Sequence, residues 1–186
     1  MKYVRREAPE TAPPQLSLAA LYEAHAGLVA RWARRLGGPS VDADDLVHEV
    51  FLVVQRRLHE WRGAARITSW LYRITEHAVH RQRRKQRLRR WLRGLAGDFA
   101  ADVPDPRPSP AEELQREQVV RMVYRALDGL ERRQRATLIL FEIEGLTGDE
   151  VAALTGTKLA TVWVRLHRAR ARFLDRLREM RARDEA

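Results

Sequence analysis

The sequence predicts an all-α protein with two small helical domains joined by a flexible, acidic, Pro-rich linker. Three observations support this prediction. Apolar residues recur at helical spacing in several stretches of the 186-residue chain, and no stretch shows the alternation typical of a β-strand. A segment rich in proline and aspartate separates two groups of these stretches. The last group ends in two helices joined by a tight glycine turn, so the second domain contains a helix-turn-helix.

The N-terminal segment divides into a tail and a first helix. Residues 1–15 are charged and contain three prolines, so we expect a disordered tail. Residues 16–36 carry apolar side chains at helical spacing, and Gly37 with the residues after it is expected to end this helix.

A second helix is expected to run to about Glu60. Ser40 or Asp42 would cap it, because a short polar side chain can accept hydrogen bonds from the first free N–H groups. Aspartates near its start lie at the positive end of the helix dipole. Residues 61–66 then read as a connecting loop.

A third helix begins near Thr68 and becomes strongly basic. The stretch from Arg81 to Arg93 holds eight basic residues and no acidic one. It is either a solvated charge run or a phosphate-binding surface, and the mutual repulsion of like charges on a helix favours the second reading. Trp70, Tyr72 and Trp91 lie in or beside this helix, where aromatic rings suit stacking on unpaired bases or packing in a core.

Composition changes sharply after this helix. The linker, residues 94–111, contains four prolines and three aspartates but one arginine. We therefore expect a first domain at 16–93, a second at 112–180 and a short C-terminal tail at 181–186.

The helix-turn-helix spans residues 146–174. Thr147 and Glu150 have capping-box spacing, so each side chain can satisfy a backbone N–H of the other residue. Gly156 suits a left-handed turn, and Thr157 can cap the helix that follows.

Two helices precede this motif in the second domain, one ending at residues 128–129 and one at 130–143. In the last helix one face is apolar and is expected to point inward: Leu159, Val162, Leu166, Ala169 and Phe173. The opposite side clusters polar and basic residues: Thr161, Arg165, Arg168 and Arg172. This is either an ordinary helical hairpin with a basic face or a DNA-reading motif.

Composition narrows the classes of function. The net charge is +10, and all but three of the 35 basic residues are arginine, which favours a polyanionic partner, although genomic base composition can also enrich arginine. The absence of cysteine excludes disulfides, thiol catalysis and cysteine-bound zinc. No signal-peptide core or apolar run of about 18 residues is present, so we expect no direct membrane insertion and a cytoplasmic location.

Two sets of motifs resemble the bacterial sigma factors. Residues 42–51, 61–63 and 68–74 (DADDLVHEVF, WRG and TSWLYRI) look like their second region. Residues 130–135, 144–147, 150–152 and 161–170 look like their fourth region. The third-region domain of primary sigma factors is missing between them, which is the layout of the extracytoplasmic-function (ECF) branch. The resemblance covers about residues 18–92 and 112–178.

This resemblance implies roles for matching positions. The second region binds core RNA polymerase and captures the non-template strand of the −10 element. Polymerase binding falls on Asp44, Asp45, Leu46, His48, Glu49, Phe51 and Gln55. Binding of −10 DNA falls on Trp61, Arg62, Gly63, Arg66, Trp70, Arg73, His77, His80, Arg81 and Arg84. A melted strand offers its bases when they are flipped into a pocket while arginines hold the backbone.

The fourth region implies binding of duplex −35 DNA through the second helix of the helix-turn-helix, in the major groove. The residues concerned are Lys158, Thr161, Trp163, Arg165, His167 and Arg168. An arginine there can bind guanine O6 and N7 together, for about 1–3 kcal/mol of discrimination. The linker resembles the segment that relatives thread toward the polymerase active-site channel.

The chain also departs from the family pattern. Trp163 and Val164 stand where a basic and a small polar residue are frequent, and Trp163 could pack on its own domain, touch a thymine methyl or meet a partner. Glu76-His77 replaces a frequent polar pair ending in asparagine, and the loop after Gly63 lacks the usual polar residues. Neither the −35 nor the −10 sequence can be transferred from relatives.

Enzymatic chemistry has little support in the sequence. Asp44 with His48, and His77 with His80, have helical spacings that could place two metal ligands together, but neither pair has a third ligand nearby. No phosphate-binding glycine loop, nucleophile elbow or HExxH motif is present. We therefore expect no catalysis, no cofactor, no metal and no small-molecule substrate.

The sequence thus favours a sigma factor that takes core RNA polymerase to promoter DNA. ECF relatives are commonly held inactive by an anti-sigma factor, often at the membrane, so such a partner is expected here. A stand-alone helix-turn-helix regulator is the alternative, although it leaves the acidic second helix and basic third helix unexplained. An RNA-binding protein that uses the arginine-rich helix alone would bind without sequence preference and with a steep salt dependence.

Overall fold

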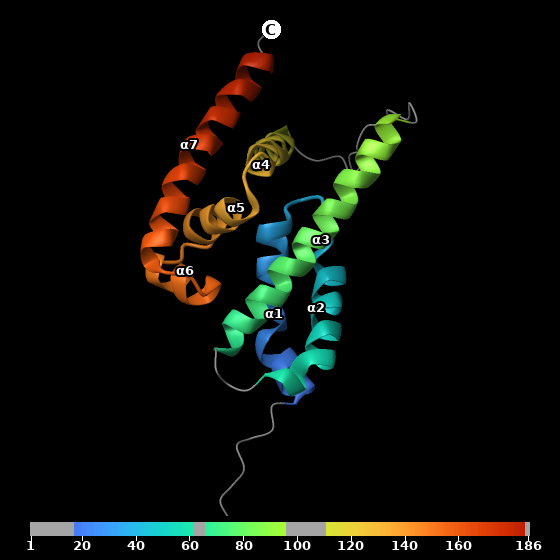
Figure 1. Cartoon of the computed structure of the whole chain (residues 1–186). Coiled ribbons are helices and arrows are strands. Elements are labelled where there is room, and N and C mark those ends of the chain that lie inside the picture. The colour runs from blue at the N-terminus through green and yellow to red at the C-terminus, as the bar shows by residue number, and fades with distance from the viewer. Residues whose placement is uncertain (1–16, 62–65, 96–110, 185–186) are drawn as a thin grey trace, which may run out of the picture.

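Three long helices form the first half of the molecule. The structure is a computed structural model, and it describes residues 17–61, 66–95 and 111–184. Helices α1 (Leu18–Gly37), α2 (Ala43–Arg57) and α3 (Ile67–Leu95) pack side by side, with the short 3₁₀ turn η1 (Leu58–Glu60) after α2 (Figure 1). The expected linker and both terminal tails lie outside the described residues, except for the ends of the linker range and residues 181–184.

Capping explains where α1 and α2 begin. The Ser17 hydroxyl accepts a hydrogen bond from the N–H of Ala20, and the Asp42 carboxylate accepts from the N–H groups of Asp44 and Asp45. Gly38 ends α1 with a φ of 83°, a conformation that strongly favours glycine. Asp42, one of the two residues predicted to cap α2, is thus confirmed in that role.

A continuous apolar core holds α1, α2 and α3 together. Its fully buried members include Leu21, Val29, Leu46, Val50, Val54 and Leu71. The rings of Trp32 and Tyr72 meet edge to face with centroids 5.4 Å apart. Truncating one of these buried leucines to alanine would lower the free energy of unfolding by about 2–5 kcal/mol. Because all three helices contribute side chains to this core, they form one structural unit.

The second half contains α4 (Ala111–Asp128), α5 (Arg132–Leu138), the π-helical turn η2 (Ile139–Ile143), α6 (Gly148–Thr155) and α7 (Leu159–Asp184). The single helix expected over residues 130–143 is therefore an α-helix followed by a π turn, in which the N–H of Glu144 bonds the carbonyl of Ile139. No strand is found in the parts of the chain that the structure describes. The all-α prediction is confirmed.

The helix-turn-helix forms as expected, and two of the three local features predicted for it are present. Thr147 and Glu150 make a complete capping box, and Gly156 adopts the left-handed conformation at φ 66° and ψ 35°. The prediction for Thr157 was wrong. Because α7 begins at Leu159, Lys158 takes the cap position, and the Thr157 hydroxyl lies 3.0 Å from that of Thr155.

The two halves dock against each other along α3. Helix α6 packs on α3, and η2 packs on α1, so the helices α4 to α7 cover one side of the first bundle while α2 lies on the other (Figure 1). The hydroxyl of Ser69 on α3 donates to the carbonyl of Ala153 on α6 at 3.0 Å. This docking brings the first turns of α7 near α3, where Arg165 and Arg73 line one cavity.

Candidate polymerase and nucleic-acid interfaces

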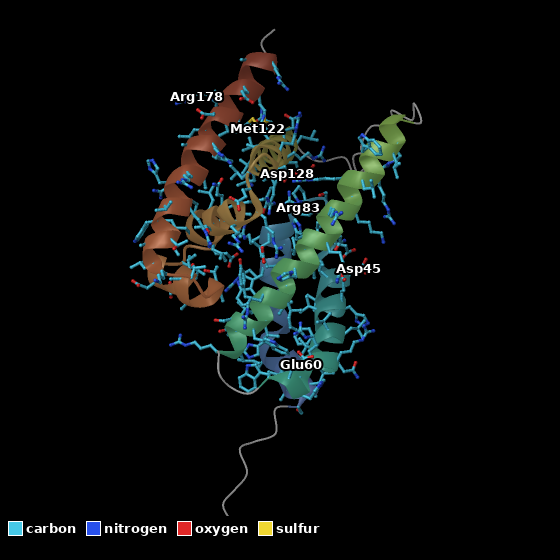
Figure 2. The ribbon with its side chains drawn as sticks, viewed as in Figure 1. Asp45, Glu60, Arg83, Met122, Asp128 and Arg178 are labelled. Atoms are coloured by element: carbon cyan, nitrogen blue, oxygen red, sulfur yellow. The ribbon has the colours of Figure 1, made fainter. Side chains whose placement is uncertain are left out.

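The outward face of α2 is acidic at its start and apolar farther along. Asp44, Asp45 and His48 are exposed there, and Figure 2 shows Asp45 on the side of the bundle away from α4 to α7. The structure corrects one residue of this predicted surface. Leu46 is fully buried in the core, because α2 turns it toward α1 and α3, so its role is to hold the helix and not to touch a partner.

An apolar groove adjoins this acidic start, between α1 and α2. It is lined by Leu18, Ala19, Tyr22, Glu23, His48, Phe51, Leu52 and Gln55. Phe51 is 6% exposed, and its ring meets that of Tyr22 edge to face with centroids 4.8 Å apart. The structure thus brings together three predicted polymerase-binding residues, His48, Phe51 and Gln55, and adds α1 residues that the sequence did not single out.

Glu49 sits apart from these three. It is half-buried and forms an ion pair with Arg81 of α3. The sequence placed these two residues in different surfaces, one for polymerase and one for DNA. Their pairing joins the two surfaces along one edge of the bundle.

A second cavity opens at the lower end of α3 beside Trp61. It has a volume of about 670 Å³ and is lined by Val53, Arg57, Glu60, Trp61, Trp70, Arg73, Ile74, His77, Ala78 and Arg81. Five of the residues predicted to bind −10 DNA meet here. Arg62 and Gly63, from the same prediction, lie outside the described residues, and Arg66 is exposed at the start of α3.

The chemistry of this cavity suits an unstacked base. Two indole rings and a histidine ring supply stacking surfaces, and three arginines supply cations for a phosphate backbone. The Nε1 of Trp61 is buried and has no acceptor among the described residues. Arg57 was missed by the sequence prediction, although its position one turn before the loop was an available signal.

His80 and Arg84 do not join this cavity. They line a different one between α3 and α5, together with Glu76, Arg83, Arg87, Arg132 and Arg135. Burial, followed by the charge of Arg132, lowers the pKa of His80. The predicted −10 set is therefore divided between two faces of α3.

Helix α7 presents the residues predicted to read −35 DNA in three directions. His167 and Arg168 are exposed on its outward side, with Lys158 exposed just before its first turn. Arg165 and Thr161, one turn apart on another side of the helix, are half-buried. Arg165 lines a cavity of about 380 Å³ that Arg73 and His77 of α3 also line.

Trp163 lies on the opposite flank of α7. Its ring meets the ring of Phe141 edge to face, with centroids 5.6 Å apart, and covers Gly148 at the start of α6. The sequence left three contacts possible for Trp163. The structure shows the first of them, packing on its own domain, and 46% of the residue is exposed. Val164 is exposed beside it.

Comparisons with known proteins agree with this geometry. Residues 21–89 match the model of Sigma-70 region 2, and residues 121–173 match that of Sigma-70, region 4. The sigma factor CnrH of Cupriavidus metallidurans is 30% identical over 166 residues, covering 85% of each chain. The ECF sigma factor SigF of Caulobacter vibrioides is 32% identical, covering 81% of this chain and 79% of SigF.

This chain belongs to the ECF branch of the RNA polymerase sigma factors. The ECF sigma factor SigE of Mycolicibacterium smegmatis is 35% identical, but this sigma factor spans only 60% of its length. Sigma factors are DNA-binding proteins of transcription initiation. The two matched regions correspond to the two helical halves of the structure.

Solved structures share the fold of this sigma factor. CnrH in complex with the cytosolic domain of CnrY has a TM-score of 0.54 at 24% identity, covering 87% of this chain and 88% of that chain. RpoE of Bartonella quintana, solved with the anti-sigma factor NepR, has a TM-score of 0.53 at 22% identity. The match covers 84% of this chain and 94% of that chain. Both likenesses support the two-domain helical fold.

The described part of the sigma factor offers no three-ligand metal cluster and no membrane span. None of its groups of His, Asp and Glu brings three potential ligands together. His77 and His80 line different cavities. None of the described helices is long and apolar enough to cross a bilayer.

The interior of the sigma factor also holds one strongly perturbed cation, Arg135 of α5. Arg135 is 6% exposed, and two of its nitrogens, Nε and Nη2, have no hydrogen-bond acceptor within the described part of the chain. Burial, and then the nearby charge of Arg83, lowers the pKa of Arg135 to about 9, while Asp128 at 3.7 Å acts in the opposite direction. Its third nitrogen donates to the carbonyl of Leu36 in the first domain.

Proposed function

We propose that this sigma factor binds core RNA polymerase through α2 and reads promoter DNA through α3 and α7. The acidic start of α2 and the groove around Phe51 form the polymerase surface. The groove supplies apolar area, and the carboxylates of Asp44 and Asp45 supply charge that can steer the encounter. The exposed position of both, on the face away from α4 to α7, supports this role.

The cavity beside Trp61 is proposed to receive a base of the melted −10 strand. This is the observation that carries the proposal, because aromatic rings and arginines from the end of α2, from Trp61 and from α3 converge on one hollow. Base stacking on an aromatic side chain contributes about 1–3 kcal/mol per base, which favours the unpaired strand once the duplex opens. The basic stretch of α3 from Arg81 to Arg93 would hold the backbone of that strand.

Helix α7 is proposed to enter the major groove of −35 DNA with His167 and Arg168 toward the bases. Arg168 is exposed and has the reach for a bidentate contact to guanine. Lys158, Thr161 and Arg165 would contact the DNA from the N-terminal end of the same helix. Trp163 would stabilise the motif from behind, through Phe141 and Gly148.

The proposed domain limits follow the sequence prediction: a region 2 domain at 16–93, a linker at 94–111 and a region 4 domain at 112–180. The protein would act in the cytoplasm and have no catalysis of its own. An anti-sigma factor is a proposed partner, because CnrH and RpoE were both solved with such proteins or their cytosolic domains. It would hold the sigma factor away from polymerase, either free or at the membrane.

The test is in vitro transcription from fragmented genomic DNA with purified core polymerase, with and without this sigma factor, followed by sequencing of RNA 5′ ends. New start sites that share two upstream motifs would support the proposal and define both motifs. A matched reaction with Asp45→Arg would lose these starts while keeping a folded protein. If core polymerase does not bind the chain, the stand-alone regulator becomes the better explanation.

A further inference from the structure

The last turns of α3 carry three large apolar side chains on one face. Leu88, Trp91 and Leu92 lie at positions i, i+3 and i+4 of the helix, so they are neighbours on its surface. Their exposed fractions are 54%, 62% and 50%, and Trp91 is the most exposed large apolar residue in the described part of the chain. We call these three residues the α3 stripe. Neighbouring apolar side chains that stay in water mark an interaction surface.

The α3 stripe faces away from the rest of the first domain. On the other side of the helix, the side-chain amide of Gln86 donates to the carbonyl of Ser40 at 2.6 Å and accepts from the Ser40 hydroxyl at 3.4 Å. At about 3.6 residues per turn, the α3 stripe lies roughly opposite Gln86. Figure 1 shows these last turns of α3 projecting beyond the end of α2. A large, flat partner can therefore reach the α3 stripe.

Basic residues surround the α3 stripe. The stretch from Arg81 to Arg93 holds eight basic residues and no acidic one. Arg84 lies one turn before the α3 stripe, and Lys85 with Arg89 lies along one side of it. These three side chains are exposed, and none of them forms an ion pair with another described residue. The end of α3 therefore presents an apolar strip within a field of uncompensated positive charge.

We propose that the α3 stripe and the basic residues around it bind the surface of a bilayer that contains anionic lipids. Leucine and tryptophan side chains enter the boundary between headgroups and acyl chains, while the long stems of lysine and arginine let their charged ends stay with the lipid phosphates. Each basic residue near such a surface strengthens binding about fivefold, the equivalent of about 1 kcal/mol. The helix lies on the bilayer and does not cross it.

Other partners would satisfy only part of this surface. DNA phosphates would pair with the arginines, but Leu88 and Leu92 gain nothing from a phosphate backbone. A second copy of the chain would bring like charges together, which opposes association. An anionic bilayer offers acyl chains and negative charge over one continuous surface. Apolar area and charge complementarity together therefore favour the bilayer.

Membrane binding would compete with promoter binding. The stretch from Arg81 to Arg93 is also proposed to hold the backbone of the −10 strand, so lipid phosphates and DNA phosphates would need the same side chains. This consequence rests on the proposed function, whereas the lipid site itself does not. A sigma factor on the membrane would be withheld from promoters until polymerase and promoter DNA displace the lipid.

Vesicle flotation with the full-length protein tests the lipid site. The vesicles contain equal amounts of phosphatidylcholine and phosphatidylglycerol, or phosphatidylcholine alone. The protein should float with the anionic vesicles and not with the neutral ones, and added salt should release it, because salt screens the attraction. Anionic vesicles with brominated acyl chains should quench part of the tryptophan fluorescence, and Trp91→Phe should remove that part. Such quenching requires the ring to reach the acyl chains, which attraction between charges alone does not produce.

Two double variants separate the α3 stripe from other exposed apolar residues. Leu88→Ser with Leu92→Ser keeps every charge and should weaken binding to anionic vesicles about tenfold or more, because two leucine side chains lose their burial. The matched control is Leu114→Ser with Leu174→Ser, which removes two leucines of similar exposure, 48% and 49%, from α4 and α7. This control should bind the vesicles like the unmodified chain.

Three results would overturn the lipid site. The first is no flotation with anionic vesicles, and the second is an equal loss of vesicle binding in the two double variants. In the third, Leu88→Ser with Leu92→Ser weakens binding to core polymerase or to a −10 oligonucleotide but leaves vesicle binding unchanged. The α3 stripe would then be a contact for polymerase or nucleic acid.

A competition experiment distinguishes the lipid site from the proposed function. The protein is mixed with anionic vesicles, core polymerase and a promoter mapped by the transcription experiment, and the promoter complexes should not float. If the protein alone floats but forms no promoter complex, the lipid site stands and the proposed function fails. If promoter complexes form normally and the protein alone does not float, the proposed function stands and the lipid site fails.

Discussion

The indole of Trp163 lies directly over Gly148, in the neighbouring helix of the helix-turn-helix. A Cβ placed on Gly148 would stand 2.7 Å from Cζ2 of Trp163 and 3.0 Å from Cδ1 of Leu159. The glycine at the first position of α6 therefore leaves room for a large ring on α7. The indole therefore packs against the start of the neighbouring helix of the motif.

Gly148→Ala is accordingly expected to destabilise the protein by about 1–3 kcal/mol, the usual cost of overpacking. The same change in a Trp163→Ala background should cost clearly less, because the ring is gone and only the flexible end of Leu159 remains close. Urea unfolding of the four proteins measures this coupling. Equal costs in both backgrounds would show that the ring does not hold the motif.

Loss of the cap on α6 is the second prediction. The Thr147 hydroxyl accepts from the N–H of Glu150, and the Glu150 carboxylate accepts from the N–H of Thr147 at 2.8 Å. Thr147→Ala should lower the free energy of unfolding by about 0.5–2 kcal/mol at neutral pH. Thr157→Ala is the matched control, because that hydroxyl caps no helix, and it should cost less.

The same capping box predicts a dependence on pH. Hydrogen bonds from Thr147 hold the pKa of Glu150 below its ordinary value of 4.5. The carboxylate therefore adds stability above its unfolded pKa, and this stability is lost as the pH falls through the lower folded pKa. The difference in unfolding free energy between wild type and Glu150→Gln should shrink between pH 6 and about pH 3, because an amide at this position does not titrate. A constant difference would mean that the carboxylate takes no part.

His77 and His80, three residues apart on α3, are expected to behave differently. His77 lines the cavity beside Trp61, whereas His80 lies in the cavity next to α5. His77→Ala should weaken binding of a single-stranded −10 oligonucleotide by polymerase holoenzyme by about 1–3 kcal/mol. His80→Ala should leave this affinity nearly unchanged. Equal losses would place the base outside the cavity.

Arg168 is expected to carry sequence preference at −35. Arg168→Ala should remove about 1–3 kcal/mol of discrimination at one or two base positions, because a bidentate contact to guanine is lost. Arg84→Ala should instead weaken promoter binding equally for all sequences. Arg178, far along α7 toward the C-terminus, offers a control with the same loss of charge (Figure 2). Competition binding with single-base variants of the mapped −35 element distinguishes the three.

Asp45 tests the polymerase surface. It is exposed on the face of α2 away from the second domain, so Asp45→Arg should not alter the fold. It should weaken core polymerase binding at least about tenfold, because a charge of the wrong sign then faces the partner. Glu117→Arg, an equal charge change on exposed α4, should bind like wild type. Unchanged affinity of Asp45→Arg would remove α2 from the interface.

The sequence by itself determined the helices and most of their ends. Signals that act within a few residues, such as the Asp42 cap, the capping box at Thr147 and the left-handed Gly156, were readable because their partners are close in the chain. The prediction at Thr157 failed because the choice between two adjacent cap positions depends on how α7 packs, which residues close in the chain do not determine. The π turn after Leu138 was also invisible, because it depends on how residues 139–144 pack in the core.

Tertiary structure decided which site residues act together. The motif resemblance placed His77 and His80 in one set and Leu46 among contact residues, but only the packing of α3 and α2 could separate the two histidines and bury Leu46. The docking of the domains was equally beyond the sequence. Pairs such as Glu76 with Arg132 and Glu144 with Arg31 join residues 56 and more positions apart. In a chain with 35 basic residues, charge alone does not indicate which arginine each carboxylate will meet.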